Sequence, residues 1–244
     1  MNVSEFSNQF DLLVSSYRRF KDFDDRELLD SIEFDEYEKS LFLTKAQEYV
    51  VLSLYNGRNS SALSFEESEE LRRYLSNIIK EASLSPIETS NGQPLGIDSR
   101  SKFFTLPEDL WFITYESAEI SNGDCDGHKQ LEVIPVRQDE YHKIKKNPFK
   151  GPNSRRALRL DLSEGNVEIV SKYDISKYYI RYLKKLYPIV LVNLPNELSV
   201  GGASEITPCQ VHEGLHQQIL ETAVDMAIMT KTGGLKKPSD ENKK

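Results

Sequence analysis

The first third of the chain carries apolar residues at the spacing of amphipathic helices. The first helix is expected from the three- and four-residue steps between Phe6, Phe10, Leu13 and Tyr17. Further helices are expected over residues 24–29, 34–55 and 64–82. Asn56-Gly57 is typical of a left-handed helix end, and Ser64 stands three residues before a glutamate, as in a capping box. The sequence therefore predicts a helical body at the start of the chain.

From residue 103 to residue 194 the pattern changes to that of strands. Leu158, Leu160 and Leu162 alternate with polar residues, a polar turn follows, and alternation resumes at Val167 and Ile169, which predicts a β-hairpin. Other strands are expected over residues 111–120, 130–136, 178–183 and 188–194, with a short helix over residues 138–146.

A final amphipathic helix is expected over residues 208–230. Its apolar face carries the residues expected to form the core of the helical body, namely Leu215, Ile219, Ala223 and Met226. The fold class expected is α+β, with N-terminal helices packed against this C-terminal helix and an inserted antiparallel β-rich region. The expected parts are a helical body (1–85), a β-rich excursion (86–205), the returning helix (206–232) and a mobile tail (233–244).

Composition narrows the classes of function. A net charge of −8 argues against a general nucleic-acid binder and an anionic-membrane binder. The two cysteines cannot form a disulfide framework, and residues 1–10 lack the features of a signal peptide. The longest apolar run, residues 189–192, is far too short to cross a bilayer. We expect a soluble protein made in a cytoplasm, with no membrane contact.

The expected last helix contains His-Glu-x-x-His at His212, Glu213 and His216, the pattern of zinc peptidase helices. A third ligand is not evident, because the extended form of the motif would need glycine and histidine where Ile219 and Thr222 stand. Pro208 and Gly214 place His212 and Glu213 in the first turn, where a glutamate also stabilises a helix without any metal. We favour the interpretation as a helix start over a peptidase.

A second metal hypothesis joins two Cys-x-x-His pairs. Cys125 with His128, and Cys209 with His212, would make a tetrahedral Cys₂His₂ zinc site if the fold brought them together. The sequence alone does not bring them together, and the alternative is one loop cysteine and one core cysteine. No metal, cofactor or catalytic residue is therefore assigned, and the scarcity of nucleophile–base motifs favours a structural or binding protein.

One strongly basic stretch interrupts this acidic chain. It has no acidic residue and contains Lys143, Lys145, Lys146, Lys150, Arg155, Arg156 and Arg159. It lacks the aromatic pattern of single-strand binding, although contact with phosphate stays an alternative. We expect this stretch to dock on an acidic neighbouring surface, such as another copy of the chain.

An ordered set of segments resembles ring or adaptor proteins from the neck, between portal and tail, of crAss-like and related tailed bacteriophages. The resemblance covers most of residues 34–229 and rests on residues 34–48, 65–73, 139–141, 147–152, 179–185, 188–191 and 209–224. It implies a structural virion protein without catalysis, whose last helix has no peptidase role. The alternatives are a zinc peptidase and a DNA-binding packaging factor.

The resemblance also implies partners. A closed ring of this protein, of twelve copies matching the portal, would contact the portal protein and other neck or tail rings. Genomic DNA would pass through without sequence-specific binding, since an acidic lumen lets DNA slide. The basic stretch would then form an inter-subunit or inter-ring contact.

Overall fold

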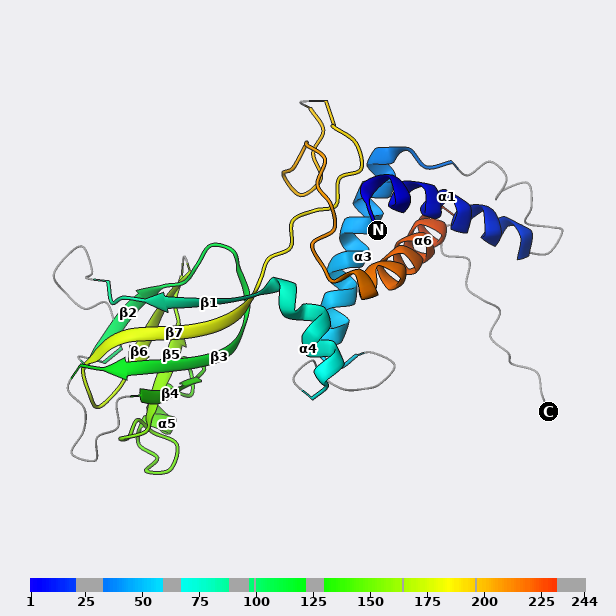
Figure 1. The fold of residues 1–244 in the computed structure, drawn as a ribbon. Helices are drawn as coiled ribbons and strands as arrows, with labels where there is room; N and C mark the ends of the chain where they lie inside the picture. The colour runs from blue at the N-terminus through cyan, green and yellow to red at the C-terminus, as the bar shows by residue number, and fades with distance from the viewer. Residues whose placement is uncertain are drawn as a thin grey trace, which may run out of the picture. The chain divides into compact units, whose positions relative to one another are not determined.

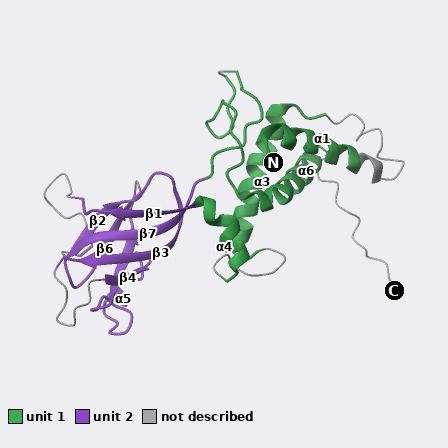
Figure 2. Ribbon diagram, in the orientation of Figure 1, with its two compact units in different colours: residues 1–78, 186–244 green, residues 79–185 purple. Residues whose placement is uncertain are grey.

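The structure, a computed structural model, describes residues 1–20, 33–58, 67–87, 97–98, 100–121, 130–163, 165–195 and 197–231, with the backbone alone for 17–20. Helices and a seven-stranded mixed sheet make the fold α+β, as the sequence predicts (Figure 1). The chain divides into two compact units, one of residues 1–78 and 186–244 and one of residues 79–185 (Figure 2). The chain leaves the first unit once and returns to it, so the sheet is an insertion.

The first unit is a helical body. Its α-helices are α1 (Val3–Phe20), α3 (Glu36–Tyr55), α4 (Glu69–Leu75) and α6 (His216–Lys231). Helix α6 packs against both α1 and α3, so the two ends of the chain meet in one core (Figure 1). The most deeply buried side chains of that core include Phe6, Phe10, Leu43, Ala46, Val51, Ile219 and Ala223. The first helix and the long third helix confirm the predictions from apolar spacing.

Both ends of α3 follow from local chemistry. Asp35 Oδ1 accepts a hydrogen bond of 2.7 Å from the Glu38 backbone N–H, and Glu38 Oε2 accepts one of 3.3 Å from the Asp35 N–H. This reciprocal capping box satisfies two backbone donors at the helix start. Gly57 has a φ of +68°, which confirms the left-handed helix end predicted at Asn56-Gly57.

The helix expected over residues 64–82 is wrong in its extent. Helix α4 begins after Ser68 and ends at Leu75, a 3₁₀ turn covers Ser76–Ile78, and a strand, β1 (Ile79–Leu84), follows. Ile78 and Ile79 fit a helical pattern, but the chain turns at that point and Ile79 pairs with Leu183 of the sheet. Tertiary strand pairing therefore overrides the local helical pattern. Ser64 and the helix expected over residues 24–29 lie outside the described residues.

The second unit is one sheet. After β1 its strands are β2 (Ser101–Thr105), β3 (Leu110–Ile120), β4 (Gln130–Pro135), β5 (Arg156–Asp161), β6 (Asn166–Val170) and β7 (Ile175–Lys184). The order across the sheet is β1-β7-β3-β4-β5-β6-β2. All pairs are antiparallel except β4 with β5, which is parallel. The expectation of an antiparallel region is thus corrected at this pair, because a long connection separates the two strands.

The predicted hairpin is confirmed by the antiparallel pairing of β5 with β6. Alternate residues of several strands fill the core of the sheet, among them Phe104, Ala118, Leu131, Val167, Ile169 and Tyr178. The predicted short helix is α5 (Tyr141–Lys145), which lies in the connection between β4 and β5. That connection contains most of the basic stretch.

The strand expected over residues 188–194 is wrong. Residues 189–191 are buried against the helical body, and the described pairing in this segment is an isolated bridge between Val190 and Thr207. A second bridge joins Val200 to Ala203, so the chain runs out and back over residues 188–207. We call residues 188–207 the arm (Figure 1, yellow to orange). Helix α6 starts only at His216, eight residues later than expected, after a 3₁₀ turn over Glu213–Leu215.

Candidate functional site

The His-Glu-x-x-His residues do not form a two-histidine ligand pair on one helix. His212 lies before the helix and caps the 3₁₀ turn, where its Nδ1 accepts a hydrogen bond of 3.1 Å from the Gly214 N–H. Its ring also packs against Tyr74 of α4. His216 is the first residue of α6. A peptidase helix would carry both histidines in its interior, so this arrangement disfavours that chemistry.

Both ring nitrogens of His216 have partners. Nε2 lies 3.0 Å from the Val211 carbonyl oxygen, which can only accept, so Nε2 carries the proton. Nδ1 lies 2.8 Å from the amino nitrogen of Met1 and therefore accepts from it. Burial lowers the pKa of His216. The neutral ring joins α1 to α6 and has no free lone pair for a metal.

The structure describes one of the two Cys-x-x-His pairs of the Cys₂His₂ hypothesis. Cys125 and His128 lie outside the described residues. The Cys209 thiol lies 3.2 Å from the Gln47 side-chain oxygen and donates to it. Burial raises the pKa of this thiol to about 11, so it stays protonated at neutral pH. Within the described ranges, no three His, Cys, Asp or Glu residues are grouped as metal ligands.

Lys145, one of the basic residues, already has a partner inside its own unit. Its ammonium group pairs with the buried carboxylate of Asp98, which also accepts a hydrogen bond of 2.9 Å from Tyr141. The hydrogen bond from Lys145 lowers the pKa of Asp98. Glu168 accepts from the Ile97 backbone N–H at 2.8 Å, so this segment is fixed to β6 and α5 together. Lys145 therefore stabilises the sheet unit through its ion pair with Asp98.

Arg159 and Arg156 are also used internally. Arg159 Nη1 donates to Glu116 Oε1 at 2.7 Å, and Tyr178 donates to Glu116 Oε2 at 2.6 Å. Burial raises the pKa of Glu116, while the Arg159 charge opposes that rise. Arg156 Nη1 donates to the Phe149 carbonyl oxygen at 2.6 Å and so ties down the loop after α5. Of the seven basic residues, these two and Lys145 have intramolecular roles.

The remaining four basic side chains are exposed. Lys143, Lys146, Lys150 and Arg155 have no ion-pair partner among the residues that the structure describes. Phe149, between them in sequence, is 85% exposed. These five residues, which we call the basic loop, combine an exposed aromatic ring with four exposed cations that lack an ion-pair partner in the described part of the chain. Such a combination suits a contact surface better than a solvated loop.

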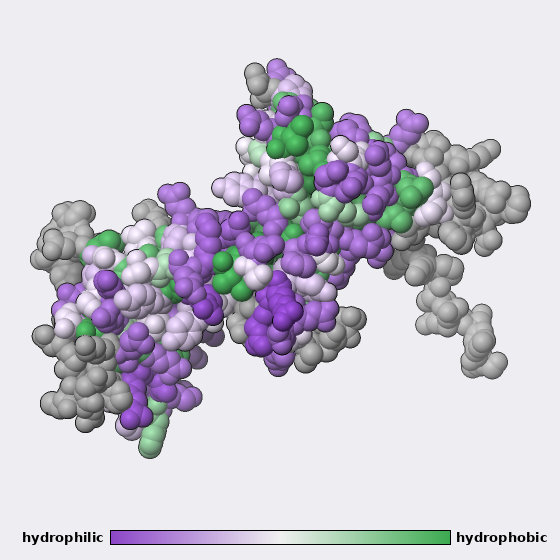
Figure 3. Space-filling view, in the orientation of Figure 1, coloured by the Kyte–Doolittle hydropathy of each residue, from purple (hydrophilic) through white to green (hydrophobic). Residues whose placement is uncertain are grey.

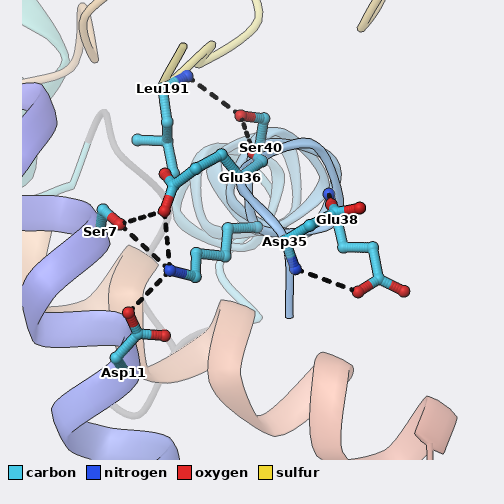
Figure 4. Close-up of polar contacts among 8 residues, drawn as sticks. Ser7, Asp11, Asp35, Glu36, Glu38, Ser40 and Leu191 are labelled. Carbon is cyan, nitrogen blue, oxygen red and sulfur yellow. Dashed lines mark hydrogen bonds and ion pairs between the residues drawn. The ribbon is translucent and has the colours of Figure 1, made fainter. Parts of the chain in front are cut away.

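Three polar residues of α3 were not identified from the sequence as functional. Ser40, Thr44 and Gln47 lie one turn apart on one face of the helix and bond the extended segment at the base of the arm. Leu191 N–H donates to Ser40 Oγ at 3.0 Å, Ile189 N–H donates to Thr44 Oγ1 at 3.0 Å, and the Gln47 amide donates to the Tyr187 carbonyl at 3.0 Å (Figure 4 shows the first of these). The helix side chains thus replace a neighbouring strand. The sequence signal for this role is the spacing of these three polar residues, at i, i+4 and i+7, on a helix face that is otherwise apolar.

A buried lysine joins α1 to α3 beside this stripe. Lys39 Nζ donates to Asp11 at 2.7 Å, to Glu36 at 2.9 Å and to Ser7 at 3.1 Å (Figure 4). Burial opposes the charge, but the two carboxylates outweigh it and raise the pKa of Lys39. The ammonium group is therefore charged and fully coordinated, which fixes α1 against the helix that holds the arm.

The expected core residues of the last helix lie at its inner face. Leu215, Ile219 and Ala223 are buried, and Met226 is half-buried. The interior of the helical body is thus made of α6 together with α1 and α3. No helix among the described residues is both long and apolar enough to cross a membrane.

Comparison with known proteins gives one consistent result. Residues 1–238 match the model of the family described as phage tail ring protein 3/4. The chain is 42% identical over 236 residues to "Ring protein 3" of Bacteroides phage crAss001, covering 95% of this chain and 97% of that protein. It is 27% identical over 244 residues to "Ring protein 4/5" of the same phage, covering 96% and 95%. The chain therefore belongs to the phage tail ring protein 3/4 family.

Proposed function

We propose that the protein is a structural subunit of the virion that assembles with copies of itself into a ring in the neck between portal and tail. The observation that carries this proposal is the family match over residues 1–238, together with the similarity to two proteins named as rings in one phage. Its action is assembly rather than catalysis: the ring continues the path by which DNA leaves the capsid.

The charge of the chain supports a role beside DNA. At −8 the protein as a whole repels a polyanion, so an acidic lumen would let the genome pass without sticking. We propose twelve copies, to match the portal, and contacts with the portal protein and with other rings of the neck or tail. The protein would be made in the host cytoplasm and reside in the virion.

The two units would have different roles in such a ring. The helical body is built from segments of both chain ends and is fixed by the Lys39 cluster, which suits the wall of a ring. The inserted sheet is a separate compact unit, which suits a contact to a neighbouring subunit or to the next ring.

Chemical cross-linking of intact particles, followed by mass spectrometry, tests this function. We expect links between copies of this chain and links to the portal protein or to another ring. Particles in which the chain links to no other copy, or which lack the chain altogether, would overturn the proposal. A control with dissociated particles separates contacts of assembly from random encounters.

A further inference from the structure

The loop after α5 presents Phe149 on a fixed backbone. Asn147 Oδ1 accepts hydrogen bonds from the Phe149 N–H at 2.8 Å and from the Lys150 N–H at 3.2 Å. The Phe149 carbonyl accepts from Arg156, and the Gly151 N–H donates to the Asn147 carbonyl at 2.7 Å. A Cβ on Gly151 would lie 2.8 Å from two backbone oxygens, so the turn closes this tightly only with glycine. The phenyl ring is therefore directed into solvent by a built turn.

An exposed aromatic ring on a fixed turn is well placed to be buried by a partner. Exposing a phenyl side chain to water is unfavourable in free energy. A fixed backbone that holds the ring in solvent is favourable only when a partner buries the ring. The four exposed cations near it in sequence, which have no ion-pair partner among the described residues, define the chemistry of that partner, which must combine apolar surface with negative charge.

The arm of the helical unit has this complementary chemistry. Over residues 188–207 it contains two acidic residues, Glu197 and Glu205, and no lysine or arginine. Neither carboxylate has an ion-pair partner in the parts of the chain that the structure describes. Its apolar side chains include Val192, Leu198 and Ile206, and Ile206 is 50% exposed. Figure 3 shows hydrophobic side chains gathered over this part of the helical unit, in the upper part of the view.

The arm is also fixed at its base. Its first residues bond Ser40 and Thr44 of α3, and the Val190–Thr207 bridge closes its two ends with N–H···O distances of 3.1 Å in both directions. Further along, the Leu194 N–H donates to the Ser204 carbonyl at 2.7 Å, and the Ile206 N–H donates to Asn193 Oδ1 at 3.0 Å. A surface held in this way can receive an anchor without a large ordering cost.

We propose that the basic loop of one subunit docks on the arm of a second copy of this chain, with Phe149 against Leu198 and Ile206 and the lysines opposite Glu197 and Glu205. Two different surfaces of each chain meet in this contact, so it is heterologous, the type that closes into a ring when the rotation between copies allows. This inference rests on the proposed ring function and assigns one of its interfaces.

Charge exchange tests the pairing with purified full-length protein. Reversing the arm (Glu197→Lys with Glu205→Lys) or the loop (Lys146→Glu with Lys150→Glu) should each weaken association more than about tenfold, because like charges then face each other. Combining the four substitutions should restore most of it. Matched controls on other exposed positions are Glu48→Lys and Lys172→Glu, which should leave association unchanged. Association is read by analytical ultracentrifugation, and circular dichroism verifies that each variant is folded.

A photoreactive benzoylphenylalanine at position 149 locates the contact directly. In a mixture of ¹⁴N- and ¹⁵N-labelled chains, we expect mixed-isotope cross-links from position 149 to residues 188–207. Rings that form but cross-link from position 149 to other residues would overturn this interface and leave the ring function standing. The same holds if the variant with all four substitutions does not recover its association. If reversing the charges of the basic loop leaves assembly unchanged but removes DNA binding at low salt, the loop contacts DNA. That result would also overturn the proposed interface. A chain that forms no oligomer and no mixed-isotope link overturns both proposals.

Discussion

Arg159 of β5 and Glu116 of β3 form an ion pair of 2.7 Å with only 11% and 9% of their side chains exposed. Tyr178 of β7 donates to the same carboxylate, so three strands meet at one buried charge. Removing one member of a buried pair leaves the other charged in a poorly solvated site. The pair therefore holds the inserted sheet together, although Arg159 lies in the basic stretch that the sequence assigns to contacts.

Arg159→Met should lower the free energy of unfolding of the sheet unit by about 3–5 kcal/mol, because Glu116 is left without its cation. Adding Glu116→Leu should recover most of this loss, since the buried charge is then gone. Urea denaturation followed by tryptophan fluorescence measures both. Arg137→Met, which removes an exposed pair with Asp139, serves as the control and should change little. An Arg159→Met protein that unfolds at the unchanged urea concentration would refute this role.

Lys39→Met should destabilise the helical body by about 1–3 kcal/mol, because Asp11, Glu36 and Ser7 lose their shared donor. The methionine keeps most of the apolar stem, so the loss reports on the ammonium group. Lys45→Met on the same helix replaces an exposed lysine and is the matched control. Equal unfolding midpoints for the two variants would show that the cluster adds nothing.

Asp98 should make the sheet unit sensitive to acid. Its folded-state pKa lies below the usual 3.8, so its ionised form stabilises the fold. That stabilisation is fully present above pH 3.8 and is lost as the pH falls through the lower folded-state pKa. Asp98→Asn should therefore be less stable at neutral pH and lose less stability on acidification. Chemical denaturation at a series of pH values checks this, with Asp139→Asn, an exposed carboxylate, as the control. A variant that keeps the full acid dependence would exclude Asp98 as its source.

The sequence was informative where the pattern was local. Alternation identified the β5–β6 hairpin, and spacing together with caps identified α1 and α3. The apolar face predicted at Leu215 and Ile219 belongs to the 3₁₀ turn and to helix α6 that follows it, and α6 packs against α1 and α3. In these cases the residues that decide the structure are neighbours in the chain.

The sequence pattern is misleading where partners far away in the chain decide the local structure. Residues 188–191 have the composition of a strand, but the backbone groups of Tyr187, Ile189 and Leu191 bond the side chains of Gln47, Thr44 and Ser40, more than a hundred positions away. The spacing of Ile79 fits a helical pattern, but in the structure this residue lies in β1 and pairs with Leu183. The basic stretch looked uniform, and only the fold separates Lys145 and Arg159, which are paired internally, from the exposed basic loop. Pairing over such distances leaves no periodic trace in the sequence.

The histidine motif gives a prediction about metal. We expect purified protein to carry no stoichiometric zinc, because His212 caps a turn and both nitrogens of His216 are hydrogen-bonded. Glu213→Gln should leave assembly unchanged, whereas His216→Ala should destabilise the contact of α1 with α6. Elemental analysis and thermal unfolding measure these. One zinc per chain, lost in both His212→Ala and His216→Ala, would restore the metal hypothesis.

A cryo-electron microscopy reconstruction of the particle neck and tail decides whether this chain forms a ring. We expect density for a closed, symmetric ring of this chain around the DNA path, with twelve copies and with the helical body in the ring wall. Density that places the chain as an isolated subunit, or that contains none of it, would contradict the proposed ring.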